Sequence, residues 1–125
     1  MVKSMSEGVE LPPQVQEELA RLQQLQQTLQ AVVAQKQQLE IDMTETDRAL
    51  TELEKVTGET PIYKSVGSIL VKADKEALLA ELKEKKELIN TRVTVLGRQE
   101  ERTRERIKEV QQKLQERLRA PRAPE

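Results

Sequence analysis

The residues of this chain that could do chemistry are almost all carboxylates, ammonium groups and guanidinium groups. The chain has 22 acidic and 21 basic residues, with no histidine and no cysteine. Acid–base catalysis, nucleophilic catalysis and zinc binding usually draw on histidine or cysteine. Phosphate binding often uses a glycine-rich loop, and no such motif occurs here. We therefore expect no enzymatic activity, no catalytic residue, no metal site and no cofactor.

The apolar residues that must position these charges recur at alternating steps of three and four along two long segments. The first carries Leu22, Leu25, Leu29, Val32, Leu39, Met43, Leu50 and Leu53, and the second carries Leu79, Leu82, Ile89, Val93, Leu96, Ile107, Val110 and Leu114. This spacing predicts a coiled-coil seam rather than the wider apolar face of a globular helix. One antiparallel register pairs both stripes over their whole length, from Leu53 with Leu79 to Leu22 with Val110.

Polar residues interrupt the two stripes at five seam positions: Lys36, Thr46, Lys86, Glu100 and Thr103. In the same register Lys86 faces Thr46, while Lys36 and Glu100 occupy adjacent layers within reach of each other. Polar groups in a seam commonly fix the register at a cost in stability. A two-helix seam encloses no pocket, so we expect these residues to set the register.

The fold expected from these patterns is all-α with a small β element, in one unit over residues 1–125. We expect a helix over about 13–56, a β-hairpin over about 61–72, a second helix over about 74–119 and a flexible tail over 120–125. Pro12 and Pro13 suit a helix entry, Gly58 and Pro61 suit a helix end, and Asp74 is a good N-cap.

The connection between the helices carries β-branched residues on both sides of Gly67, which predicts a β-hairpin. A turn at Val66–Gly67 would pair Tyr63 with Leu70 and Ile62 with Val71. An isolated hairpin is marginal in water and leaves two open edges, so we expect hairpins from several chains to form a shared sheet or barrel. The expected oligomer interface comprises Ile62, Tyr63, Val66, Gly67, Ile69, Leu70 and Val71. The alternative is a linker folded against its own coil.

The seam weakens at the end far from the hairpin, where Glu18 faces Leu114 and Val15 faces Arg117. We expect the last layers to splay and to expose an apolar patch that binds other proteins. The residues expected in this patch are Val9, Leu11, Val15, Leu19, Val110, Leu114 and Leu118. The alternative is ordinary fraying without a ligand.

Three stretches resemble the prefoldin family in its β-type class. Pro12-Pro13-Gln14-Val15-Gln16 with residues 25–43 (LQQTLQAVVAQKQQLEIDM) resembles the glutamine-rich first helix. Residues 62–72 (IYKSVGSILVK) resemble the single hairpin and are the most specific stretch. Leu96 with Arg98-Gln99-Glu100 resembles the signature of the second helix, from which Gly97 departs.

The resemblance implies an ATP-independent chaperone subunit. It implies a hexamer with two α-type subunits and other copies of this β-type subunit, whose hairpins form β-barrels and whose coiled coils project as arms. Unfolded proteins would be captured at the tips of the arms and delivered to a group II chaperonin in the cytoplasm. Chains of this short type are typical of archaea, and a eukaryotic subunit is the alternative source.

Other functions fit the sequence less well. The net charge is −1, and the basic residues after Arg98 alternate with acidic ones and lack stacking aromatics, so we expect no nucleic-acid binding. No apolar run is long enough for a membrane span. The remaining alternative is a coiled-coil spacer or tether without client binding, which would need no hairpin.

Overall fold

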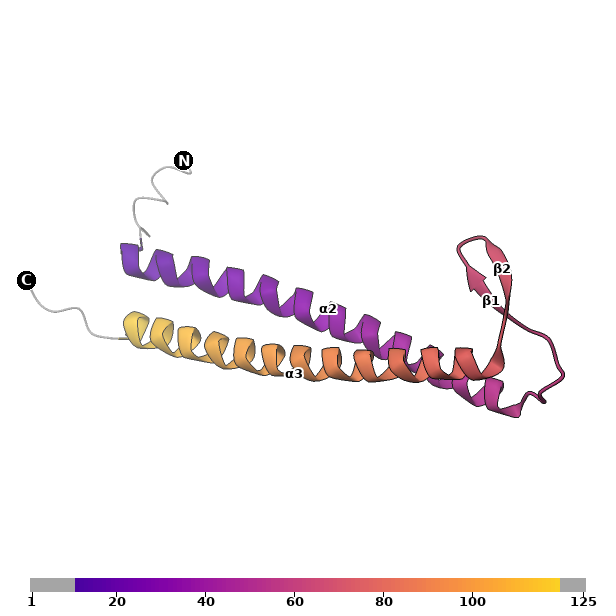
Figure 1. Ribbon diagram of the computed structural model, residues 1–125. Coiled ribbons are helices and arrows are strands. Elements are labelled where there is room, and N and C mark those ends of the chain that lie inside the picture. Colours follow the sequence, from indigo (N-terminus) through magenta and orange to yellow (C-terminus); the bar gives the residue numbers. More distant parts are fainter. Residues whose placement is uncertain (1–10, 120–125) are drawn as a thin grey trace, which may run out of the picture. The chain divides into compact units, whose positions relative to one another are not determined.

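The computed structural model describes residues 11–119 as two long helices joined by an antiparallel β-hairpin (Figure 1). Helix α2 spans Pro13–Lys55, strands β1 and β2 span Ile62–Val66 and Ile69–Ala73, and helix α3 spans Lys75–Arg119. The predicted combination of two helices with one hairpin is confirmed. Val9 and the tail 120–125 lie outside the described residues. That the whole chain acts as one unit stays a prediction.

The chain divides into two compact units, each containing a piece of both helices. The terminal unit includes 11–33 and 98–119, and the hairpin unit is Ala34–Gly97, which contains β1 and β2. Within each unit the two helical pieces run side by side in opposite directions (Figure 1).

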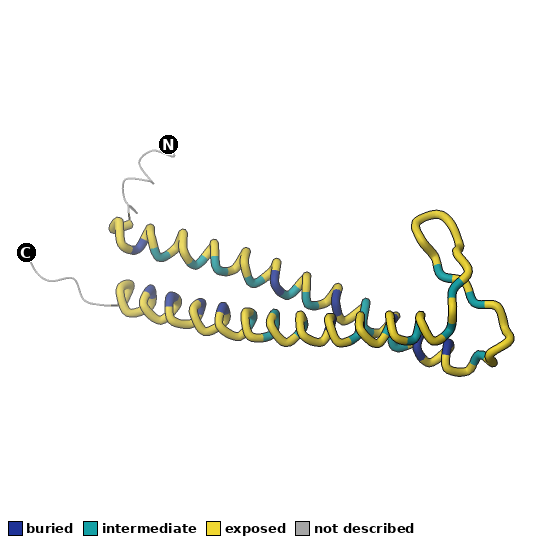
Figure 2. The backbone as a smooth tube through the Cα atoms, viewed as in Figure 1, coloured by how far each residue is buried: buried dark blue, intermediate teal, exposed yellow. Residues whose placement is uncertain are grey.

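The buried residues of both units follow the predicted seam (Figure 2). The buried apolar residues on α2 are Val15, Val32, Leu39, Leu50 and Leu53, and those on α3 are Ile89, Ile107, Val110 and Leu114. The other seam leucines, valines and Met43 are partly buried. The alternating steps of three and four therefore identified the core. On α2 the core extends one heptad beyond the predicted stripe, from Leu22 to Val15.

Side chains at the hairpin end of the helices satisfy backbone groups that the helices leave unpaired. The Asp74 carboxylate accepts a hydrogen bond from the backbone N–H of Ala77 at 3.0 Å, which confirms the predicted N-cap. The Lys75 ammonium donates to the carbonyl of Val56 at 2.6 Å. The start of α3 is thereby tied to the end of α2, and the hairpin leaves from a fixed base.

The hairpin register differs from the predicted one. Val66 pairs with Ile69 and Tyr63 pairs with Lys72, so the turn is Gly67–Ser68 rather than Val66–Gly67. Gly67 has a φ of 61° and is the first central residue of this turn. A two-residue turn with positive φ at its first central position matches the twist of the strands, and glycine adopts it without strain. The correction moves each partner by two residues and therefore leaves every side chain on its predicted face.

Candidate functional site

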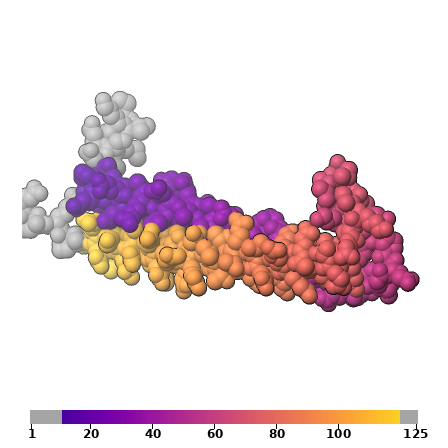
Figure 3. Space-filling view, in the orientation of Figure 1, coloured from indigo at the N-terminus to yellow at the C-terminus, as the bar shows by residue number. Residues whose placement is uncertain are grey.

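The hairpin exposes apolar side chains that the rest of its own unit does not cover. The exposed fractions are 60% for Ile69, 72% for Leu70 and 56% for Tyr63. The loop of the hairpin stands clear of the helices (Figure 3). The sheet contains only β1 and β2 within the described residues, so each strand has one unpaired edge. An apolar two-stranded ribbon with open edges is suited to pairing with strands of another chain.

The two faces of the hairpin differ in character. The register places Ile62, Val66, Ile69, Val71 and Ala73 with Lys64 on one face, and Tyr63, Ser65, Leu70 and Lys72 on the other. The ammonium group of Lys64 lies 3.2 Å from the Glu81 carboxylate of α3. This ion pair holds the face that carries Lys64 toward α3. At the outer end of the same face, Val66 and Ile69 are exposed.

The second predicted site, the free end of the coiled coil (the tip, residues 11–19 and 110–119), is closed. Val15, Val110 and Leu114 form a buried cluster against which Leu22 and Leu25 pack. Their exposed fractions are 4%, 6% and 6%. The predicted splaying is therefore wrong for this structure, and these three side chains are not presented to solvent.

An ion pair that the seam pattern did not identify explains the closure. The Arg117 guanidinium donates to the Glu18 carboxylate at 2.8 Å and also to the side-chain oxygen of Gln14. Glu18 and Arg117 come from adjacent layers and pair with each other. Val15 and Leu114, the residues predicted to face them, pack together in the buried cluster. The opposite signs of Glu18 and Arg117 in neighbouring layers could have indicated this contact.

The exposed part of the predicted tip patch consists of three leucines. Leu11 is 37% exposed, Leu19 is 42% exposed and Leu118 is 67% exposed. Leu19 and Leu118 each follow a seam position by one residue, which places them on the same flank of the antiparallel pair. Such side chains, rimmed by charge, form a small apolar surface beside the closed seam.

The two threonines of the seam are satisfied by their own helices. Thr46 is 3% exposed and donates to the carbonyl of Asp42 at 2.7 Å. Thr103 is 8% exposed and donates to the carbonyl of Gln99, also at 2.7 Å. A buried hydroxyl needs a hydrogen-bond partner, and here that partner is supplied locally.

The charged seam residues are only partly buried and use their length to reach the flanks. The Lys86 ammonium lies 2.8 Å from the Asp47 carboxylate. Glu100, in the terminal unit, accepts a hydrogen bond from Arg104 at 3.1 Å, and Lys36 is partly buried in the hairpin unit. That these residues set the register stays a prediction.

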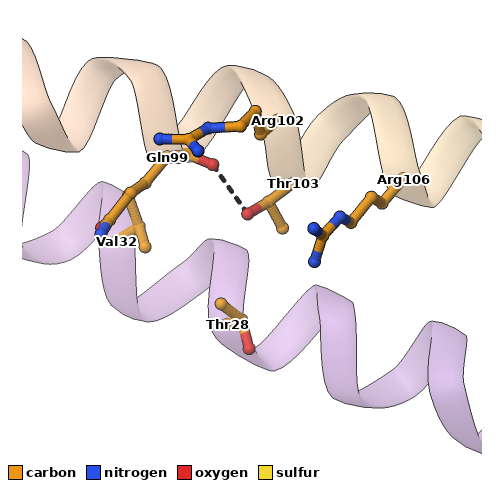
Figure 4. A pocket seen from close by; sticks show the side chains of 6 residues that line it. All are labelled: Thr28, Val32, Gln99, Arg102, Thr103 and Arg106. Carbon is orange, nitrogen blue, oxygen red and sulfur yellow. Dashed lines mark hydrogen bonds between the residues drawn. The ribbon is translucent and has the colours of Figure 1, made fainter.

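A groove of about 290 Å³ lies on one flank of the terminal unit (Figure 4). It is lined by Thr28, Val32, Gln99, Arg102, Thr103 and Arg106. Both threonine hydroxyls donate to carbonyls of their own helices, and the groove contains neither a carboxylate nor another side chain suited to acid–base work at neutral pH. We assign no reaction to it.

Comparison with known proteins connects the hairpin and the seam to one family. The family model described as prefoldin subunit matches residues 16–120. The prefoldin subunit beta of Archaeoglobus fulgidus is 58% identical over 106 residues, which cover 85% of this chain and 91% of that protein. The chain belongs to the prefoldin family. Prefoldins are chaperones rather than enzymes, and their subunits assemble with other prefoldin subunits.

Further relatives support the β-type class of prefoldin. The prefoldin subunit beta of Pyrococcus furiosus is 49% identical over 113 residues, covering 90% of this chain and 97% of that protein. The crystal structure of the prefoldin beta subunit from Thermococcus strain KS-1 matches with a TM-score of 0.79 and 43% identity, covering 90% of this chain and 98% of that one. The resemblance to β-type prefoldin subunits is therefore confirmed. Neither helix within 11–119 has an apolar stretch that could cross a bilayer.

Proposed function

We propose that this chain is a prefoldin β subunit that assembles through its hairpin and holds unfolded proteins at the tip of its coiled coil without nucleotide. The observation that carries the proposal is the exposed apolar ribbon of the hairpin, with Ile69 and Leu70 more than half exposed. Prefoldin subunits assemble with one another, and this chain exposes an apolar ribbon. Together these facts support a barrel built from the hairpins of several subunits. The partners are α-type subunits and further copies of this chain, and the predicted interface residues remain those of 62–71.

Client binding is proposed for the three exposed leucines of the tip. Leu11, Leu19 and Leu118 present apolar surface at the tip. In the sequence, Glu18 precedes Leu19, and Arg117 and Arg119 flank Leu118. Several arms of one assembly would contact a client together, so weak individual contacts would add up to useful avidity. Val15, Val110 and Leu114 would join this surface only when the last layers separate.

The proposals for where the client goes next and for the cellular compartment rest on family membership alone. We propose that the client is passed to a group II chaperonin in the cytoplasm. A spacer or tether without client binding is the second candidate, but it would leave the exposed tip leucines and the hairpin without a use.

Assembly is tested by placing a charge on the exposed ribbon. Ile69→Asp should leave the helical content of the chain nearly unchanged, because Ile69 is 60% exposed and outside the seam. It should convert the complex formed with an α-type subunit into small species, as measured by light scattering. Lys72→Asp, at the base of β2, is a matched control that changes charge without removing an apolar contact. Native mass for Ile69→Asp would contradict the proposed interface.

A further inference from the structure

An apolar groove of about 320 Å³ lies at the base of the hairpin, entirely within the hairpin unit. Its apolar lining includes Ala49, Leu53, Val56, Ile62, Leu78 and Leu82. Leu53 is buried at 6% exposure and belongs to the seam, whereas Ala49 is exposed and the other four are only partly buried. The groove is a depression beside the seam in which apolar surface stays hydrated.

The chain itself leaves this surface uncovered at a measurable cost. Each square ångström of apolar surface kept in water costs about 25 cal/mol relative to its burial. A contiguous apolar depression on a chain with 34% charged residues is the kind of surface that another protein covers. A small-molecule site would need several convergent polar groups to orient a ligand, whereas most of this lining is aliphatic and its polar members are Glu52, Thr60 and Tyr63.

The position of the groove identifies its occupant. Ile62 and Tyr63, which belong to β1, form part of its wall, and the outer edge of β1 is unpaired within the described chain. A strand added to that edge would bring its own hairpin next to the groove. The hairpin of this chain shows what such a neighbour offers, since Leu70 is 72% exposed on it.

We propose that the groove receives an apolar side chain from the hairpin of a neighbouring prefoldin subunit. The groove thereby extends the assembly interface from the strands onto α2 and α3, which the predicted interface of residues 62–71 does not include. The inference rests on the proposed assembly through the hairpin. It assigns a role to Ala49 in particular, because this small exposed residue leaves the groove open.

The test places a large side chain of this chain itself in the groove. Ala49→Trp places an indole where the neighbour's side chain would bind, on an exposed position of α2 that does not disturb the seam. Ala34→Trp is the matched control, since Ala34 is exposed on the same helix and in the same unit but does not line the groove. Both variants should keep the helical content of the parent chain.

The expected result is a loss of assembly for Ala49→Trp only. In the complex reconstituted with an α-type subunit, its dissociation midpoint should rise about tenfold or more in protein concentration, because one apolar side chain loses its binding pocket. Ala34→Trp should dissociate like the parent. Analytical ultracentrifugation over a dilution series measures both midpoints.

Other outcomes overturn the inference in distinguishable ways. If Ala49→Trp dissociates like the parent while Ile69→Asp falls apart, the groove has no neighbour and the hairpin assembly still stands. If Ala49→Trp keeps its mass but no longer protects a denatured protein, the groove binds clients instead. If neither Ala49→Trp nor Ile69→Asp changes the mass, both proposals fail.

Discussion

A threonine can occupy an apolar seam without a partner on the facing helix because its hydroxyl can bond to its own helix. Thr46 and Thr103 do so, each donating to the carbonyl four residues earlier. The longer polar residues behave differently. Lys86 and Arg117 reach carboxylates on the other helix, at 2.8 Å in both cases, so their charges leave the apolar layer while their methylene groups stay in it.

Replacing Lys86 by leucine should stabilise the hairpin unit. The lost ion pair with Asp47 is half-exposed and worth roughly 0–1 kcal/mol, whereas a leucine in the seam contributes about 1.5–3 kcal/mol if fully buried. We expect Lys86→Leu to raise the free energy of unfolding by about 1 kcal/mol, measured by chemical denaturation. Lys85→Leu, one position off the seam, is the control that should give no gain. A loss of stability for Lys86→Leu would show that the pair with Asp47 holds more than its exposure indicates.

Replacing Arg117 by methionine should open the tip. The Glu18 carboxylate would lose its charged partner, and its second oxygen already accepts no hydrogen bond from the described residues while buried. An unpaired, largely buried carboxylate is expensive, so the two adjacent layers that contain Val15 and Leu114 should separate. Hydrogen exchange of amides 15–22 and 107–114 should become at least tenfold faster. Lys113→Met is the control, and equal protection in both variants would contradict the role of Arg117.

At the scale of elements, the seam was predictable because it depends on periodicity alone. Leu22 to Leu53 and Leu79 to Leu114 lie where alternating steps of three and four place them, and Asp74 caps α3 as its residue type indicates. The hairpin register was not predictable in the same way, because Gly67 suits either central position of a tight turn. The closed tip was not predictable from the apolar pattern of the seam, because that pattern does not show that Arg117 and Glu18 pair between layers.

The turn of the hairpin provides a direct test of the observed register. Gly67 has a φ of 61°, a conformation that costs a residue with a Cβ about 1–2 kcal/mol. Gly67→Ala should therefore weaken the hairpin and lower the thermal midpoint of the assembled complex. Gly58→Ala is the matched control, since Gly58 does not have a positive φ and an added Cβ there meets no atom within 4 Å. Equal midpoints for the two variants would show that this turn is not the one used in the assembly.

At the scale of the whole molecule, exposed apolar side chains gather on the hairpin and at the tip, whereas Ile41, Leu88 and Val95 are exposed singly along the helices. Ile69 and Leu70 mark one place, and Leu11, Leu19 and Leu118 mark the other. The hairpin surface suits permanent association with other subunits, because strand pairing and apolar burial act together there. The tip surface is smaller and suits reversible contact with an unfolded protein.

Client binding at the tip is tested most directly by the aggregation of a denatured protein, followed by light scattering without nucleotide, in the presence of the assembled complex. The variant Leu11→Ser/Leu19→Ser/Leu118→Ser removes the exposed apolar side chains of the tip and leaves the buried cluster of Val15, Val110 and Leu114 intact. We expect the parent complex to suppress aggregation and the triple variant, at unchanged native mass and helical content, to lose most of this suppression. A triple variant that keeps its mass and protects the client as well as the parent would contradict client binding at the tip.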